Sequence, residues 1–131
     1  MGRQQARGGG TATLFATALD TRFAMSLPSC YFCTFKASIL AMYHCSCNYA
    51  PGPLNRCEMY DVAGLIAPRP LLVIAGAEDP IFPLAGVHEA YAQVREVCEA
   101  LGAEANLELY VGPEGHRYYK ARTWDFVRER L

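Results

Sequence analysis

The stretch Pro70-Leu71-Leu72-Val73-Ile74-Ala75-Gly76 is an unbroken apolar run bounded by proline and glycine. Apolar side chains at every position suit a strand that is buried on both faces, because a strand with one face in water alternates apolar and polar residues. Strands of this kind are typical of parallel sheets covered by helices. The run therefore predicts an α/β domain built on a parallel sheet.

The segments around this run extend the prediction. Residues 84–101 carry apolar side chains at three- and four-residue steps, which predicts a long helix, and Gly102 is suited to end it. Residues 107–111 alternate apolar and polar and predict a second strand. A third strand is predicted over residues 23–27, before Pro28.

The remaining pattern completes a single domain over residues 1–131. Further helical segments are predicted over 11–19, 37–43, 61–66 and 119–131. An irregular insertion is predicted over residues 36–69, where no strong periodicity runs through the sequence. Strands separated by helical connections indicate about three parallel strands with flanking helices.

Composition and charge limit the partners that we expect. Lys plus Arg number 12 and Asp plus Glu 13, so the net charge is −1, and no basic field favours nucleic acid or an anionic membrane. No apolar run reaches the ~18 residues of a spanning helix. Asp20-Thr21-Arg22 interrupts the apolar run near the start, which argues against a signal peptide. A transit peptide stays possible, but a cytoplasmic location is favoured.

The chain contains six cysteines, at positions 30, 33, 45, 47, 57 and 98. Cys30 and Cys33 with Cys45 and Cys47 suggest a four-ligand zinc site, but the second pair is spaced more closely than in zinc knuckles. Unpaired cysteine usually packs as a small buried hydrophobe. We therefore expect core cysteines and no metal, with metal binding and redox chemistry as the alternatives.

A carboxylate and an imidazole follow the ends of two predicted neighbouring strands. Asp79 lies in the loop after residues 71–75, and His116 lies in the loop after residues 107–111. Ligands of open parallel sheets bind beyond these strand ends. A carboxylate that accepts from one imidazole nitrogen orients the ring, so that the other nitrogen can take a proton. The alternative is structural: Asp79 as a turn former before Pro80, and His116 as a surface loop residue.

The order of these motifs resembles the C-terminal half of an α/β-hydrolase. Residues 61–74, with their Ala-Pro-Arg-Pro segment, the acid loop Gly76–Pro83 and the loop Gly112–His116 are similar to the branch of dienelactone hydrolases and acetyl (xylan) esterases. The resemblance runs from about Gly8 to Leu131. It implies that Asp79 is the acid and His116 the base of a catalytic triad acting on small-molecule esters, with no metal or organic cofactor.

The nucleophile of that family is a serine on a sharp strand–turn–helix elbow. The glycines Gly8, Gly9 and Gly10 with Thr11 match the elbow of this branch, and the serine position falls on Arg7. Arginine has no unprotonated form at neutral pH and cannot attack a carbonyl. The resemblance therefore implies an ester hydrolase that is inactive or weak on its own. Residues that could replace the serine are Thr11, Ser26, Ser29 and Cys30, of which Cys30 follows a predicted strand end near His116.

The sequence also supports a second hypothesis, a non-catalytic binding remnant of the fold. The strand that feeds the elbow is normally central, so a chain that begins at the elbow leaves residues 23–27 with an unpaired edge. Unpaired edges invite association with another strand. Self-association through this edge is the partner that this hypothesis predicts.

Overall fold

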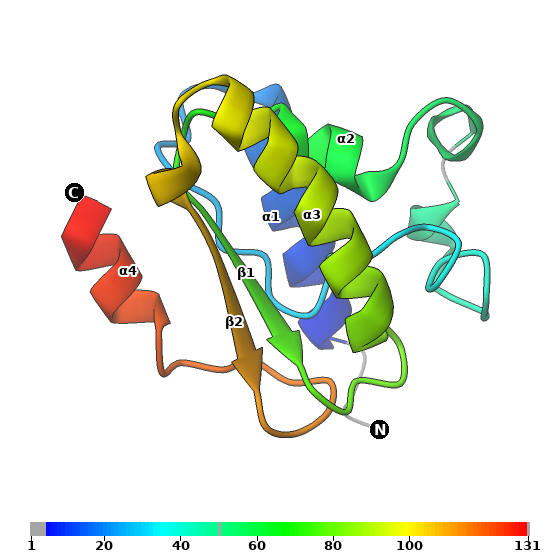
Figure 1. The fold of residues 1–131 in the computed structure, drawn as a ribbon. Helices are drawn as coiled ribbons and strands as arrows, with labels where there is room; N and C mark the ends of the chain where they lie inside the picture. The colour runs from blue at the N-terminus through cyan, green and yellow to red at the C-terminus, as the bar shows by residue number, and fades with distance from the viewer. Residues whose placement is uncertain (1–4, 50, 131) are drawn as a thin grey trace.

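The computed structural model describes residues 5–49 and 51–130, and the side chains from Gly8 onward within them. A parallel pair of strands forms the centre, with Leu71 opposite Leu107 and Gly76 opposite Gly112. The strands are β1 (Leu71–Gly76) and β2 (Leu107–Gly112). The helices of the described part are α1 (Gln5–Leu19), α2 (Met59–Gly64), α3 (Leu84–Ala100) and α4 (Thr123–Arg130), with short 3-10 helices η1 (Ser46–Asn48), η2 (Pro53–Asn55) and η3 (Glu104–Asn106). Helix α3 connects the two strands (Figure 1), as the sequence predicts.

Side chains of β1 alternate between two apolar cores. Leu71, Val73 and Ala75 pack in the larger core, to which α1, α2 and α3 contribute. Leu72 and Ile74 pack in a smaller core with Phe126 of α4, which lies apart from the other helices in Figure 1. Every residue of β1 is buried. The prediction of a strand covered on both faces is therefore confirmed.

The third predicted strand, residues 23–27, is replaced in the described part of the chain by two isolated bridges to β1, one at Ser26 and one beyond the predicted strand at Ser29. The N–H of Ser26 donates to the Pro70 carbonyl, and the carbonyl of Ser26 accepts the N–H of Leu72, both at 2.9 Å. Pro28 has no N–H to continue this ladder, and Cys30 leaves the extended conformation with a φ of 48°. The sheet therefore has two full strands where the sequence predicts about three.

Helix α1 begins at Gln5 and takes in the glycines that we expected to form a turn before it. A Cβ atom on Gly10 would lie 2.5 Å from the Cβ of Tyr31 and 2.9 Å from the Ser29 carbonyl oxygen, whereas one on Gly8 or Gly9 would meet nothing within 4 Å. Gly10 therefore allows α1 to pack directly against the segment beside β1.

Within the insertion, the predicted helix over 37–43 is wrong and the one over 61–66 begins earlier. Residues 35–42 form turns, and the Ser38 hydroxyl donates to the Ile81 carbonyl at 2.6 Å, which holds this segment on the loop after β1. Helix α2 begins at Met59 because Glu58 and Asp61 form a capping box. The segment 123–130 of the predicted last helix forms α4.

Arg69, from the Ala-Pro-Arg-Pro segment, connects α1 to the start of β1. Its guanidinium donates to the Thr17 and Phe23 carbonyls, both at 2.8 Å, and to the Asp20 carbonyl at 3.3 Å. Thr17 lies in the last turn of α1, where carbonyls have no partner in the helix. Within the described residues, no helix has the length and apolar character needed to cross a membrane.

Candidate active site

The loops after β1 and β2 are in contact at the C-terminal edge of the sheet. The N–H of Glu78 in the first loop donates to the Glu114 carbonyl in the second at 3.1 Å. A Cβ atom on Gly76 would lie 2.3 Å from the Gly115 carbonyl oxygen, so this close approach requires glycine at position 76. The parallel pairing of β1 with β2 therefore brings the two predicted site residues to one place.

Asp79 and His116 form a hydrogen-bonded pair between these loops. The Nδ1 of His116 lies 2.8 Å from Oδ2 of Asp79. The other carboxylate oxygen accepts the N–H groups of Ile81 at 2.8 Å and Phe82 at 3.1 Å. Burial by itself would raise the pKa of Asp79, but the hydrogen bonds from His116 and these N–H groups lower it overall. Asp79 is therefore a buried carboxylate held ionised by its donors.

The second nitrogen of His116 is available for chemistry. Its Nε2 atom is buried and has no hydrogen-bond partner among the described residues. The Phe82 ring stacks on the imidazole, with 5.8 Å between ring centroids and 23° between the planes. With Nδ1–H donated to Asp79, the neutral ring carries its lone pair on Nε2. The pair thus has the arrangement of a general base and the carboxylate that orients it.

Tyr119 supports the histidine loop, a role that sequence reasoning missed. Its hydroxyl donates to the Gly115 carbonyl at 2.8 Å and accepts from the N–H of Glu114 at 3.1 Å. The ring lies against Gly112, where a Cβ atom would be 2.2 Å from it. The sequence offers no signal for this contact, because residues 119–131 are predicted as one helix.

Cys30 lies beside the pair, at the sheet end that we expected for it. Ligand atoms of Cys30, Asp79 and His116 all lie within 4.8 Å of one another. The Cys30 thiol donates to the Arg117 carbonyl at 3.0 Å, and burial raises its pKa to about 11. It is therefore a protonated thiol at neutral pH. A divalent metal could use these three donors only after Cys30 loses its proton and the bond between Asp79 and His116 is replaced.

The other cysteines divide into two environments. Cys33 and Cys98 are buried, in agreement with the expected core role, and Cys57 is half-buried. Cys45 and Cys47 are exposed, so the expectation of core packing is wrong for them. In the described part of the chain, the possible metal ligands that lie together are Cys30, Asp79 and His116. The four cysteines of the zinc hypothesis do not form such a group.

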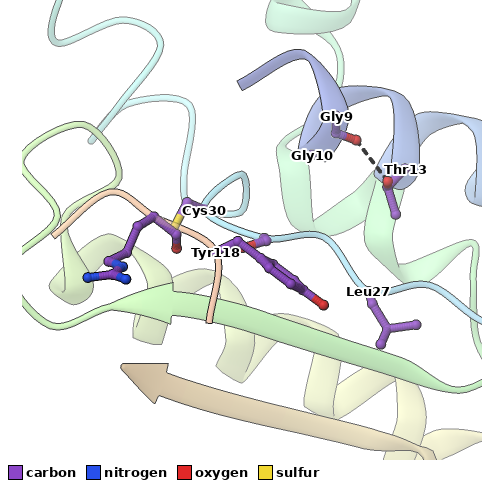
Figure 2. Close-up of a pocket in the computed structure, with 8 residues that line it drawn as sticks. Gly9, Gly10, Thr13, Leu27, Cys30 and Tyr118 are labelled. Atoms are coloured by element: carbon purple, nitrogen blue, oxygen red, sulfur yellow. Dashed lines mark hydrogen bonds between the residues drawn. The ribbon is translucent and has the colours of Figure 1, made fainter. Parts of the chain in front are cut away.

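A cavity of about 300 Å³ lies between the N-terminal part of α1 and the segment beside β1. Its lining residues are Gly9, Gly10, Thr13, Leu27, Ser29, Cys30, Arg117 and Tyr118. Figure 2 shows Gly9, Gly10 and Thr13 on the helix, facing Leu27, Cys30 and Tyr118 across it. Arg117 follows His116 directly, so the cavity adjoins the Asp79–His116 pair. The side chain of Arg7, the predicted serine position, lies outside the described residues.

Comparisons with solved structures identify the fold. The chain is similar to a glucuronoyl esterase of carbohydrate esterase family 15 from Caldicellulosiruptor kristjansonii, with a TM-score of 0.77 and 19% identity over 95% of this chain and 41% of that one. A glucuronoyl esterase catalytic domain from Hypocrea jecorina matches with a TM-score of 0.72 and 16% identity, over 95% and 42%. A putative dienelactone hydrolase from Klebsiella pneumoniae matches with a TM-score of 0.50 and 18% identity, over 94% and 46%.

These matches define the class of fold. The chain folds as the C-terminal part of an α/β-hydrolase, the fold that the sequence motifs resemble. It spans about 41% of the length of the first of these esterases. No family model matches the sequence, and no curated protein matches it.

Proposed function

We propose that this chain is the acid–base part of a carboxylic ester hydrolase, with Asp79 and His116 as the triad acid and base. The hydrogen bond of 2.8 Å from the histidine to Asp79 carries the proposal, together with Nε2, which has no hydrogen-bond partner in the described part of the chain. In such a triad the histidine takes the proton of the nucleophile and later gives it to the leaving group, while the carboxylate stabilises the imidazolium. Small-molecule esters are the substrates in this proposal.

The same proposal assigns the serine position to Arg7 and predicts weak or no activity for the chain by itself. Arginine supplies no nucleophile, and the Cys30 thiol beside the pair holds its proton because burial raises its pKa to about 11. The second donor of an oxyanion hole comes in this fold from a loop near the start of the domain. The chain matches 41% of the length of the first of these solved esterases, and this proposal places the loop outside the matched part.

Hydrolysis of p-nitrophenyl acetate by the purified chain tests the proposal, with His116→Ala as the matched variant. We expect the original chain to hydrolyse the ester no faster than His116→Ala. Turnover by the original chain that His116→Ala abolishes would overturn the prediction of inactivity, and it would identify Cys30 as the next residue to substitute.

A second variant, Arg7→Ser, tests whether a serine at the elbow position is sufficient for activity. We expect this variant to remain inactive towards the ester and unlabelled by a fluorophosphonate probe. Labelling that requires His116 would show that the Asp79–His116 pair activates a serine at this position. That result would support the assigned base but contradict the prediction that the serine alone is insufficient.

The second candidate function is a non-catalytic module that self-associates through the strand edge at residues 25–29. Ser26 and Pro28 direct backbone groups towards β1, so Leu27 between them directs its own the other way. Among the described residues, no backbone hydrogen bond joins Leu27 or Ser29 to another segment. The cavity of about 300 Å³ lies along this same edge. A second copy of the chain is the partner in this proposal.

A further inference from the structure

Cys45 and Cys47 form an exposed pair of thiols that the Asp79–His116 site does not use. Their sulfur atoms lie 2.8 Å apart, and both residues are exposed. A disulfide joins its sulfurs at about 2.05 Å, so a small movement separates this pair from a covalent bond. Cys45 precedes η1 and Cys47 lies in it, whereas Cys30, Cys33 and Cys98 are buried.

Asn48 holds an amide group against both sulfurs. Its Nδ2 lies 3.1 Å from Sγ of Cys45 and 3.8 Å from Sγ of Cys47. Its Oδ1 accepts the hydroxyl of Tyr31 at 2.8 Å, and this bond orients the amide with its N–H groups towards the thiols. Both Asn48 and Tyr31 are buried. The donor is therefore fixed by the core, whereas the thiols it contacts are open to solvent.

The two sulfurs have different roles in this geometry. The two sulfurs lie within hydrogen-bond distance of each other, and either thiol can be the donor. The Cys45 sulfur is also the closer of the two to the Asn48 amide. An N–H donor stabilises a thiolate, which is the form that attacks a disulfide. Cys45 is therefore the attacking sulfur and Cys47 the resolving one.

We propose that Cys45 and Cys47 are a thiol–disulfide exchange site that takes low-molecular-weight disulfides as its oxidant. The Cys45 thiolate attacks one sulfur of the disulfide, which forms a mixed disulfide and releases one thiolate. Cys47 then loses its proton and attacks the Cys45 sulfur, which closes the intrachain bond and releases the second thiolate. Two cysteine thiols are oxidised, and one disulfide is reduced to two thiols.

The surroundings favour this chemistry over a metal site. Among the described residues, the group of possible metal ligands is Cys30, Asp79 and His116, so no third ligand of this kind joins Cys45 and Cys47. A structural zinc site takes four ligands. Two thiols whose sulfurs lie 2.8 Å apart, with no third metal ligand beside them among the described residues, suit a disulfide instead.

Oxidation of the full chain by glutathione disulfide tests the proposal. We expect the intact mass to fall by two hydrogen atoms and peptide mapping to link Cys45 to Cys47. Cys47→Ser is expected to stop at a mixed disulfide with glutathione on Cys45, and Cys57→Ser to react like the original chain. A different cysteine pairing, six free thiols after oxidation, or stoichiometric zinc retained in place of a disulfide would overturn the proposal.

A matched pair of charge changes tests the role of the amide. Asn48→Asp replaces the N–H donors with a carboxylate and is expected to slow the exchange about tenfold, because a charge-assisted hydrogen bond to the thiolate is lost. Asn55→Asp makes the same change at an exposed residue of the insertion and is expected to leave the rate unchanged. Circular dichroism establishes that both variants are folded. Equal rates in folded variants would overturn the assigned role of Asn48.

Discussion

At the scale of single residues, close backbone approaches decide where the site can form. Gly76 lets the loop after β1 touch the loop after β2, and Gly10 lets α1 touch the segment that carries Cys30. Neither contact leaves space for a methyl group. The two glycines thus position the elements on which the Asp79–His116 pair and the adjoining cavity depend.

The neighbouring glycines of α1 provide a matched test. Gly10→Ala places a Cβ against Tyr31 and the Ser29 carbonyl, and it is expected to lower the free energy of unfolding by about 1–3 kcal/mol. Gly9→Ala meets nothing within 4 Å in the same helix, and it is expected to raise that free energy by about 0.5–1 kcal/mol. Urea unfolding followed by circular dichroism measures both. Equal effects of the two substitutions would contradict the close packing of α1.

The lowered pKa of Asp79 predicts a pH-dependent contribution to stability. A carboxylate with a lower pKa in the folded state stabilises the protein above its unfolded pKa of about 3.9, and this stabilisation is lost as the pH falls through the folded pKa. Asp79→Asn is expected to cost about 1–3 kcal/mol at pH 7. The difference from the original chain is expected to shrink below about pH 4.

Urea midpoints for the two proteins at pH 7 and pH 3 measure this difference. Asp125→Asn, on an exposed residue of α4, serves as the control for a change of one carboxylate. A gap between Asp79→Asn and the original chain that stays constant over this range would show that ionisation of Asp79 does not stabilise the fold.

At the scale of elements, Arg69 joins the end of α1 to the start of β1. Its guanidinium donates to the carbonyls of Thr17, in the last turn of α1, and of Asp20 and Phe23, which follow the helix. The sequence motif Ala-Pro-Arg-Pro is therefore a structural connection between two elements that flank the site, although the arginine itself touches neither Asp79 nor His116.

Substitution of Arg69 tests this connection. Arg69→Ala is expected to lower the free energy of unfolding by about 2 kcal/mol, because hydrogen bonds from a charged donor are lost. Arg69→Lys is expected to recover less than half, since an ammonium cannot reproduce the planar fork. Arg56→Ala, at an exposed position, is expected to change the free energy of unfolding by no more than about 0.5 kcal/mol. Thermal unfolding measures these changes. Equal losses of stability in Arg69→Ala and Arg56→Ala would contradict a structural role for Arg69 between α1 and β1.

At the scale of the whole molecule, the chain shares the fold of part of an α/β-hydrolase. Helices cover both faces of β1, and the segment beside β1 directs alternate backbone groups away from it. The edge and the cavity lie where another strand could pair. The proposed self-association belongs to this scale because it depends on the arrangement of α1, the edge and the histidine loop together.

Two substitutions at one position test the edge. Leu27→Pro removes an N–H that points away from β1, whereas Leu27→Ala removes only side-chain volume. If two copies pair here, Leu27→Pro is expected to weaken dimerisation roughly tenfold, because each copy loses a backbone hydrogen bond. Leu27→Ala is expected to have a smaller effect. Sedimentation velocity over a range of concentrations measures both, and a monomer at all concentrations would exclude the self-associating module.

Local pattern was sufficient for the elements with strong periodicity. The continuous apolar run at residues 71–76, the helix at 84–100 and the alternating strand at 107–112 were all predicted, and Gly102 ends the helix with a φ of 62°. Segments with weak periodicity were not. Residues 35–42 form turns instead of a helix, and the Ser38 hydroxyl donates to the Ile81 carbonyl, a contact between distant parts of the chain.

For the candidate site, the sequence by itself determined the residue types and their order. Asp79 and His116 follow strands that must be parallel neighbours, so their proximity could be predicted from strand order alone. Only the tertiary structure decided that the third strand is reduced to two bridges, that Tyr119 holds the histidine loop, and that Cys45 and Cys47 are exposed beside Asn48. The physical reason is that periodicity reports which face of an element is buried, whereas hydrogen bonds and close contacts between loops depend on the packing of the complete chain.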